Sequence, residues 1–270
     1  MPAAEPSLAE DLALVTEVAR EAGALSLDWL KRGAKSWEKS PDNPVTEADL
    51  AVNDLISKRL RSARPGYGWL SEETRDNPAD RTQVRTFVVD PIDGTKAFLR
   101  HEPGYCISIA RLEGGQPVVG ALFNPLTDEL FCALAGGGAR LNGQPIKASV
   151  SAGLEGARMI LRPEIAARLK AHPAWPAMEF LSPIPNSIAW RIALVACGRW
   201  DAAIGIKRTN DWDVAAAALI LSEAGGIGTD GEGAAFVFNQ AVTQHPGVVA
   251  AGANLHPLLM DRLREMGRRP

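Results

Sequence analysis

Several residue types on which common protein classes depend are scarce in this chain of 270 residues. It contains three cysteines, Cys106, Cys132 and Cys197, an odd number scattered through apolar segments. This usage excludes a disulfide framework and a thiolate zinc site, and it is typical of reduced core residues. The four histidines form no pair at metal-ligand spacing. Any metal ion is therefore expected to have oxygen ligands.

Long apolar runs and an excess of one charge are missing as well. No segment approaches the roughly 20 apolar residues that a membrane-spanning helix needs. The N-terminal residues lack the charged-then-apolar pattern of a signal peptide, so we expect a cytoplasmic protein without a membrane span. Lys and Arg number 29 against 32 Asp and Glu, a formal net charge of −3. This balance provides no electrostatic footprint for a nucleic acid polymer.

The first quarter of the chain shows helical periodicity twice. Apolar residues recur on one face of residues 8–31, and we expect this helix to end near Gly33. A second helix is expected to begin at Thr46, because Asp49 follows three residues later and completes a capping box. The polar segment between the two helices, residues 35–44, is predicted to be a loop.

The pattern of the chain changes near residue 150. Before this point, apolar runs separated by glycine-containing turn dipeptides predict a series of antiparallel strands. After it, short apolar strands alternate with helices. We therefore expect an α+β half, residues 1–150, and a smaller α/β half, residues 151–270, packed as one body because no long linker separates them.

Acidic residues gather at the expected ends of strands and helices. The segment FVVDPIDGTKAF places Asp90 and Asp93 where an apolar strand ends, and like charges this close repel each other. Other acids at element ends are Glu72, Glu73, Asp49 and Asp213. Each alone has an ordinary explanation, such as the helix dipole or a turn dipeptide. Together, with no basic cluster beside them, they predict a divalent cation, and Mg²⁺ suits carboxylate ligands best.

The turn after Asp93 supplies a complementary feature. A short helix that begins at Gly94 and Thr95 would present free backbone N–H groups to an anion. Gly94 permits close approach of a ligand because it has no Cβ, and the Thr95 hydroxyl could position a water molecule. Metal ions, an anion-binding helix start and a hydroxyl together predict metal-assisted hydrolysis of a phosphate ester.

Four segments occur in an order that resembles the inositol monophosphatase superfamily. They are PVTEAD at 44–49, SEE at 71–73, DPIDGTKAF at 90–98 and WDVAAAALILSEAGG at 212–226. The resemblance covers nearly the whole chain. It implies a layered αβαβα sandwich with the site between its halves, often a homodimer, and a lithium-sensitive, Mg²⁺-dependent phosphoric monoester hydrolase.

The resemblance also implies roles for individual residues. The implied ligands of two or three Mg²⁺ ions are Glu72, Asp90, the carbonyl of Ile92, Asp93 and Asp213. The implied catalytic residues are Glu72 and the pair Asp49 and Thr95, which would orient and deprotonate the attacking water. The N–H groups of Gly94 and Thr95 would bind the phosphate. Most of these residues fall in the 1–150 half, whereas the 151–270 half contributes Asp213 and substrate contacts.

The identity of the small phosphorylated substrate is less constrained by these motifs. DGTK-x-F, SPDNPVTEAD and RTNDWD resemble the CysQ-type branch, a 3′(2′),5′-bisphosphate nucleotidase that converts 3′-phosphoadenosine 5′-phosphate to AMP and phosphate. Ala189 departs from that branch, which often has lysine there. Candidate substrate contacts are Lys39, Lys96, Ser187 and Arg191. A solvated lysine and a helix-capping serine are the structural alternatives.

Other functions stay open at this point. An inositol-1-monophosphatase is the main alternative, and histidinol phosphate or a sugar phosphate are further possible substrates. A catalytically silent protein that binds nucleotide or metal as a regulator is the non-enzymatic alternative. The intact set of acids and the water-activating pair favour an enzyme.

Overall fold

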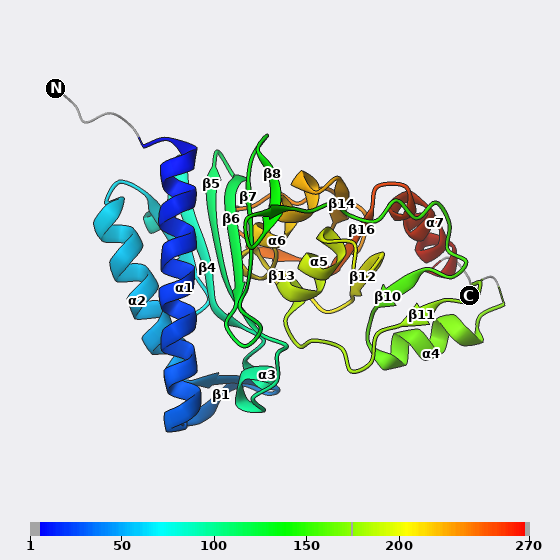
Figure 1. The fold of residues 1–270 in the computed structure, drawn as a ribbon, viewed down its shortest axis with the longest axis horizontal. Helices are drawn as coiled ribbons and strands as arrows, with labels where there is room; N and C mark the ends of the chain where they lie inside the picture. Colours follow the sequence, from blue (N-terminus) through cyan, green and yellow to red (C-terminus); the bar gives the residue numbers. More distant parts are fainter. Residues whose placement is uncertain (1–5, 174, 268–270) are drawn as a thin grey trace.

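The computed structural model describes residues 6–173 and 175–267 of the chain. Helices and sheets alternate in five layers from left to right in Figure 1, which confirms the predicted αβαβα sandwich. The helices are α1 (Leu8–Arg32), α2 (Glu47–Ala63), α3 (Thr95–Leu99), α4 (Pro163–Ala171), α5 (Ile188–Ala196), α6 (Asp211–Glu223) and α7 (Leu255–Gly267), with a 3-10 turn η1 (Pro78–Arg81).

The first sheet has seven strands in the order β3-β4-β5-β6-β7-β8-β9. These are β3 (Gly68–Ser71), β4 (Arg85–Asp93), β5 (Cys106–Glu113), β6 (Gln116–Asn124), β7 (Glu129–Leu134), β8 (Gly138–Leu141) and β9 (Gln144–Pro145). All neighbours are antiparallel except β3 and β4, which run parallel. Helices α1 and α2 cover one face and α6 the other, so the central strands are apolar on both sides.

The second sheet is smaller and mixed, with five strands in the order β11-β10-β12-β16-β14. These are β10 (Arg158–Ile160), β11 (Glu179–Phe180), β12 (Ala202–Gly205), β14 (Gly226–Thr229) and β16 (Val248–Gly252). Helices α5 and α6 lie between the two sheets, and α4 and α7 pack on the outer face. A separate two-stranded pairing joins β13 (Thr209–Asn210) to β15 (Gln244–His245) beside the start of α6.

The helix boundaries follow the predicted signals. The N–H of Gly33 caps the end of α1 by donating to the carbonyl of Trp29. At the start of α2, the Thr46 side chain accepts a hydrogen bond from the Asp49 N–H at 3.3 Å, and the Asp49 carboxylate accepts from the Thr46 N–H at 2.8 Å. The predicted capping box is therefore confirmed, and it holds the Asp49 side chain in one orientation.

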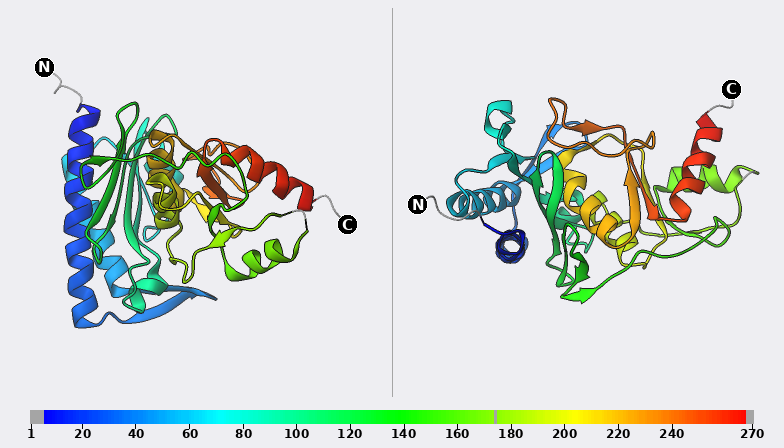
Figure 2. Two further views of the ribbon diagram at one scale, coloured as in Figure 1. Left: turned by 45° about the vertical axis from the view of Figure 1, so that its right-hand side comes forward. Right: turned by 90° about the horizontal axis from the view of Figure 1, so that it is seen from above.

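The prediction of a loop over residues 35–44 is wrong. Strands β1 (Ser36–Ser40) and β2 (Asn43–Thr46) pair antiparallel as a hairpin beside α3, visible at the lower edge of the left view of Figure 2. The proline residues and the polar composition hid this hairpin, because both are more common in loops. The hairpin places Lys39 against Glu72, and Asp42 against Lys96 in the first turn of α3.

None of the helices described for residues 6–173 and 175–267 is long and apolar enough to cross a lipid bilayer.

Candidate active site

The predicted acidic residues converge where the two sheets and α6 meet. Glu72 follows β3, Asp90 and Asp93 lie on β4, and Asp213 lies in the first turn of α6. These four side chains, which we call the acidic floor, line a cavity of about 540 Å³. Glu72 and Asp213, which are 141 positions apart in the sequence, therefore reach the same site, as the ordered motifs predicted.

An irregularity in β4 explains how two of these acids share one face of the sheet. Asp90 pairs with Ser108 of β5 and Asp93 pairs with Cys106, so three steps along β4 match two steps along β5. In a regular strand, residues three apart point to opposite faces. The extra residue of this bulge restores a common direction, and both carboxylates line the cavity.

The acidic floor concentrates negative charge in a desolvated position. Burial raises the pKa of Asp90 well above its usual range, and the charges of Glu72, Asp93 and Asp213 raise it further. Burial and the charge of Asp93 likewise raise the pKa of Asp213. Burial raises the pKa of Asp93 to about 6, although hydrogen bonds from Ser187 and Ala189 oppose the shift. These shifts mean that the site favours protons or cations.

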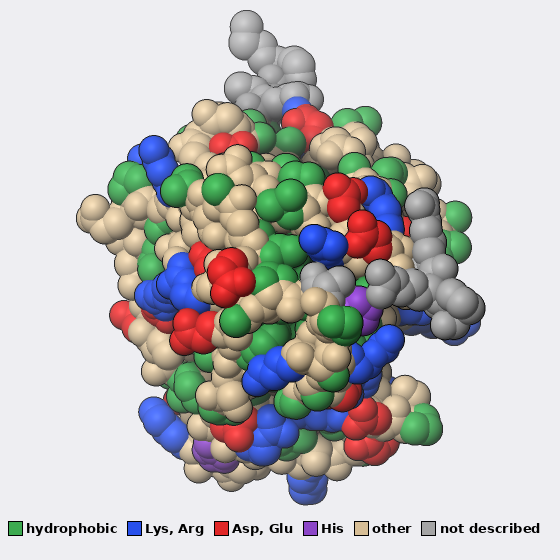
Figure 3. Space-filling view, turned by 90° about the vertical axis from the view of Figure 1, so that its right-hand side faces the viewer, with side chains coloured by type: hydrophobic (Ala, Val, Ile, Leu, Met, Phe, Trp, Pro, Cys, Tyr) green, Lys and Arg blue, Asp and Glu red, His purple; other side chains and the backbone are tan. Residues whose placement is uncertain are grey.

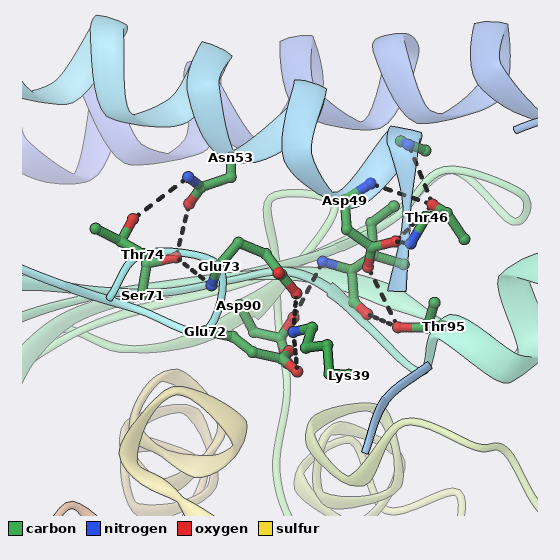
Figure 4. Close-up of polar contacts among 12 residues, drawn as sticks. Lys39, Thr46, Asp49, Asn53, Ser71, Glu72, Glu73, Thr74, Asp90 and Thr95 are labelled. Carbon is green, nitrogen blue, oxygen red and sulfur yellow. Dashed lines mark hydrogen bonds and ion pairs between the residues drawn. The ribbon is translucent and has the colours of Figure 1, made fainter. Parts of the chain in front are cut away.

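Asp49 and Thr95, the predicted water-activating pair, are in contact. The Thr95 hydroxyl lies 3.2 Å from Asp49 Oδ1 and 3.3 Å from the carbonyl of Ile92. The other carboxylate oxygen of Asp49 accepts from the Thr46 N–H and hydroxyl (Figure 4). Burial raises the pKa of Asp49 to about 6, against the lowering effect of the Thr46 hydrogen bonds. Asp49 is thus held by α2 with one oxygen directed to Thr95.

Lys39 approaches the acidic floor from strand β1. Its ammonium nitrogen lies 3.1 Å from Glu72 Oε1 and also pairs with Glu73, as Figure 4 shows. Burial raises the pKa of Glu73 to about 7, and the neighbouring charge of Glu72 adds to the shift despite the Lys39 contact. We predicted Lys39 as a substrate contact, whereas in the structure its ammonium group pairs with the carboxylates of Glu72 and Glu73.

The donor set of the acidic floor fits a hard divalent cation, because every side chain in it offers carboxylate oxygens. As they stand, no three His, Cys, Asp or Glu side chains among the described residues are arranged to hold a metal ion. Asp90 accepts from the Ile92 N–H at 3.0 Å, and Asp213 accepts from the Asn210 N–H at 2.6 Å. Glu72 pairs with Lys39.

The turn between β4 and α3 depends on a glycine. Gly94 has φ of +99°, in the left-handed region, and forms the N-cap of α3. A Cβ at this position would lie 2.9 Å from the carbonyl oxygen of Gly104 and 3.0 Å from the Ser187 nitrogen. Glycine is therefore required by conformation and by space. The turn presents Gly94, Thr95 and Lys96 to the cavity, as the sequence predicted.

The remaining predicted substrate contacts have different surroundings. Ser187 is fully buried, donates to Asp93 and accepts from the Trp190 N–H, so it caps α5 and supports a floor carboxylate. Arg191 lines the cavity and donates to the carbonyls of Pro185 and Asn186. Lys96 lines the cavity and pairs with Asp42 of the hairpin. Lys96 and Arg191 are placed to meet a ligand, and Ser187 is not.

Several cations of the cavity were missed from the sequence. They are Arg100, Arg162, Lys207 and Arg208. They belong to none of the four motifs, and three of them come from the second half of the chain. Only the folded arrangement brings them to one opening.

Comparisons with known proteins agree with this geometry. Residues 7–268 match the model of the family described as the inositol monophosphatase family. Inositol monophosphatase 1 of Solanum lycopersicum is 33% identical over 241 residues, which cover 85% of this chain and 88% of the relative. Nus factor SuhB of Xylella fastidiosa is 37% identical over 205 residues, which cover 73% and 72% of the two chains.

The fold of this chain is also found in solved structures. The extragenic suppressor protein SuhB of Bartonella henselae superposes with a TM-score of 0.83 at 28% identity, covering 94% of this chain and 98% of that one. On the family model, the relatives and the shared fold, this chain belongs to the inositol monophosphatase family.

Proposed function

We propose that the protein hydrolyses the phosphate monoester of a small metabolite, with water as the nucleophile. One observation carries the proposal: acids from both halves of the chain converge on one cavity beside the Asp49–Thr95 contact. Glu72, Asp90, Asp93, Asp213 and the carbonyl of Ile92 would hold the Mg²⁺ ions, whose number, two or three, stays a prediction. When bound, Mg²⁺ lowers the pKa of water and offsets charge on the phosphate oxygens.

The residues of the chain have complementary tasks in this reaction. Thr95 orients the attacking water through its hydroxyl, and Asp49 accepts the proton of that water. A carboxylate whose pKa is raised to about 6 is a suitable general base near neutral pH. The backbone N–H groups of Gly94 and Thr95 would bind the phosphate oxygens, since the first N–H groups of a helix have no intrahelical acceptor. The transferred group goes directly to water, so a covalent intermediate is not needed.

For the substrate, we propose a 3′(2′),5′-bisphosphate nucleotide, hydrolysed at the 3′ or 2′ position. The motif lysine Lys96 and the other cations of the cavity support an ester with a second anionic group. The second candidate is inositol-1-phosphate. It is favoured by the names of relatives, among them inositol monophosphatase 1 of Solanum lycopersicum.

Phosphate release tests both the proposed reaction and the proposed substrate. The purified protein is assayed with 3′-phosphoadenosine 5′-phosphate, inositol-1-phosphate and histidinol phosphate, with Mg²⁺, with a chelator, and with Mg²⁺ plus Li⁺. We expect Mg²⁺-dependent, Li⁺-sensitive release that is fastest from the bisphosphate. Asp49→Asn protein, purified in the same way, is the control for contaminating phosphatases.

The outcomes separate the candidates. No release from any of the three esters above the Asp49→Asn background would exclude the phosphatase and favour the regulatory alternative. A higher kcat/KM for inositol-1-phosphate would overturn the nucleotidase and leave the phosphatase in place. The homodimer also stays a proposal, which analytical ultracentrifugation of the full chain tests.

A further inference from the structure

Side chains of both charges line the cavity. Besides the acidic floor, the lining includes six cations, which we call the basic rim: Lys96, Arg100, Arg162, Arg191, Lys207 and Arg208. On the face shown in Figure 3, Lys and Arg side chains gather in the lower half with acidic side chains between them. Rim cations that pair with acidic side chains of the protein differ from those that are available to an anionic ligand.

Most of the basic rim has acidic partners from the chain. Lys96 and Lys207 both pair with Asp42, and Arg100 pairs with Glu102. Arg208 donates to the side-chain oxygen of Gln244 at 3.2 Å. These contacts lie at exposed positions, where an ion pair contributes little and exchanges readily with solvent ions.

Arg191 differs from the other rim cations. Its side chain is only 9% exposed, and its Nε and Nη2 atoms donate to the carbonyls of Pro185 and Asn186 at 2.7 and 3.0 Å. In the part of the chain that the structure describes, its guanidinium forms no ion pair within 4 Å. The charge of Asp93 acts on this guanidinium without a direct ion pair, and Asp93 is itself an expected metal ligand. Because a buried cation is costly when it has no directly paired anion, the position favours a negatively charged ligand.

A second guanidinium adds to the positive charge that favours an anionic ligand here. Arg162, the N-cap residue of α4, lines the same cavity, and its own partner Glu164 is exposed. Burial lowers the pKa of Arg191; the charge of Asp93 opposes this, and the charge of Arg162 lowers it further. Two like charges that disfavour each other in one cavity are stabilised by an anion between them. The buried hydroxyl of Thr209, which lines this cavity too, has no hydrogen-bond partner among the described residues.

We propose that Arg162 and Arg191 form a subsite for a second anionic group of the substrate, separate from the phosphate that is hydrolysed. This inference rests on the proposed function and adds the residues that bind the second anionic group of the substrate. Apolar side chains of Ile184, Ile188 and Ile206 line the cavity as well. The subsite therefore fits a compact metabolite in which a neutral or apolar scaffold separates two anions.

A matched pair of substrates isolates the second anion. The compounds 3′-phosphoadenosine 5′-phosphate and adenosine 3′-phosphate share the scissile ester and differ only in the 5′-phosphate. We expect wild-type kcat/KM to favour the bisphosphate by about 10-fold or more, the equivalent of one charge-assisted hydrogen-bonded contact. Arg162→Gln should reduce this preference about 10-fold, mainly through the KM for the bisphosphate. The Arg162 side chain makes no capping hydrogen bond to α4, so the variant keeps its fold.

Arg100→Gln is the control, because Arg100 is also a rim cation but pairs with Glu102 at an exposed position. Its bisphosphate preference should equal that of the wild type. An equal loss of the bisphosphate preference in both variants would contradict a specific subsite, because it would show that the positive charge of the whole rim causes the preference. A wild-type preference near one would overturn the subsite and leave the phosphatase intact, whereas no Mg²⁺-dependent release from either ester would overturn the proposed function.

A binding measurement without metal removes the dependence on catalysis. Adenosine 5′-phosphate is added to the protein in chelator, and the thermal unfolding midpoint is recorded for the wild type, Arg162→Gln and Arg100→Gln. We expect the nucleotide to raise the midpoint of the wild type and of Arg100→Gln, and to have little effect on Arg162→Gln. Equal shifts in all three proteins would contradict the proposed subsite.

Discussion

Asp90 and Asp201, two buried aspartates in different sheets, illustrate two ways of burying charge. Asp201 precedes β12 and accepts from the N–H of Arg158 at 2.8 Å and from its Nε and Nη2 atoms at 3.1 and 2.8 Å. Burial alone would raise the pKa of Asp201, but the Arg158 bonds outweigh it and lower the pKa. Asp90 accepts a hydrogen bond from the Ile92 N–H, and burial together with the charges of four acidic neighbours raises its pKa.

The difference identifies what each charge is for. A buried carboxylate that is paired with arginine contributes to stability and has little capacity left for a ligand. A buried carboxylate surrounded by other acids destabilises the protein by itself and becomes favourable only when a cation binds. We therefore expect Asp201 to contribute to folding and Asp90 to contribute to cation binding.

Replacing each aspartate by asparagine tests this distinction with the largest expected effect. Asp90→Asn should lower kcat at least about 1,000-fold with Mg²⁺, because an expected metal ligand is lost. The same change should raise the free energy of unfolding of the metal-free protein by about 1 kcal/mol or more, because one repelling charge is removed. Asp201→Asn should lower that free energy by about 2 kcal/mol, since charge-assisted hydrogen bonds are weakened, and keep wild-type kcat.

Urea unfolding in chelator and phosphate release with Mg²⁺ measure the two quantities. If Asp90→Asn unfolds at lower urea than the wild type while retaining turnover, the residue belongs to the fold. If Asp201→Asn loses turnover at full stability, the second sheet takes part in catalysis, and the distinction between the two regions fails.

Thr95 sharpens the comparison within the first half of the chain. Thr95→Val keeps the shape of the side chain and removes the hydroxyl that contacts Asp49 and the Ile92 carbonyl. We expect kcat to fall about 100-fold with little change in KM, the usual range for losing one group of an acid–base pair. Thr95→Ser, which restores the hydroxyl, should recover most of the rate. Equal rates for the serine and valine variants would show that the hydroxyl has no role.

The acidic floor could be predicted from the sequence because each of its acids lies within a short motif. Local signals, such as a capping box, a strand end or a glycine turn, also place these acids at the ends of elements. The layered αβαβα fold was implied by the family resemblance, whereas apolar periodicity predicted individual helices, strands and the change of pattern near residue 150. Both kinds of signal depend on residues that are close in sequence.

The basic rim and the β1–β2 hairpin could not be predicted in the same way. Arg162 lies at the start of α4 and has no motif around it, and only the fold brings it near Arg191. Likewise, nothing local shows that Lys39 contacts Glu72, 33 residues away. Substrate specificity depends on such distant pairings, which explains why the reaction class was clearer from the sequence than the substrate.

The pH dependence of stability gives the smallest expected effect and tests the acidic floor in the unmodified protein. Burial raises the pKa of Asp49 and Asp93 to about 6 and that of Glu73 to about 7. A raised pKa means that the folded state binds more protons than the unfolded state. The metal-free protein should therefore lose stability as the pH rises from about 5 to about 7.5, and its unfolding midpoint should fall by a few degrees.

Added Mg²⁺ should reverse this trend, because metal binding requires deprotonated carboxylates and competes with the protons. The increase in midpoint caused by Mg²⁺ should be larger at about pH 7.5 than at about pH 5. The Asp90→Asn protein provides the control, since with one repelling charge removed its metal-free midpoint should depend less on pH. A metal-free midpoint that rises between these pH values would mean that paired carboxylates such as Asp201, with their lowered pKa, dominate the titration. The repulsion within the acidic floor would then be too weak to explain why it needs a cation.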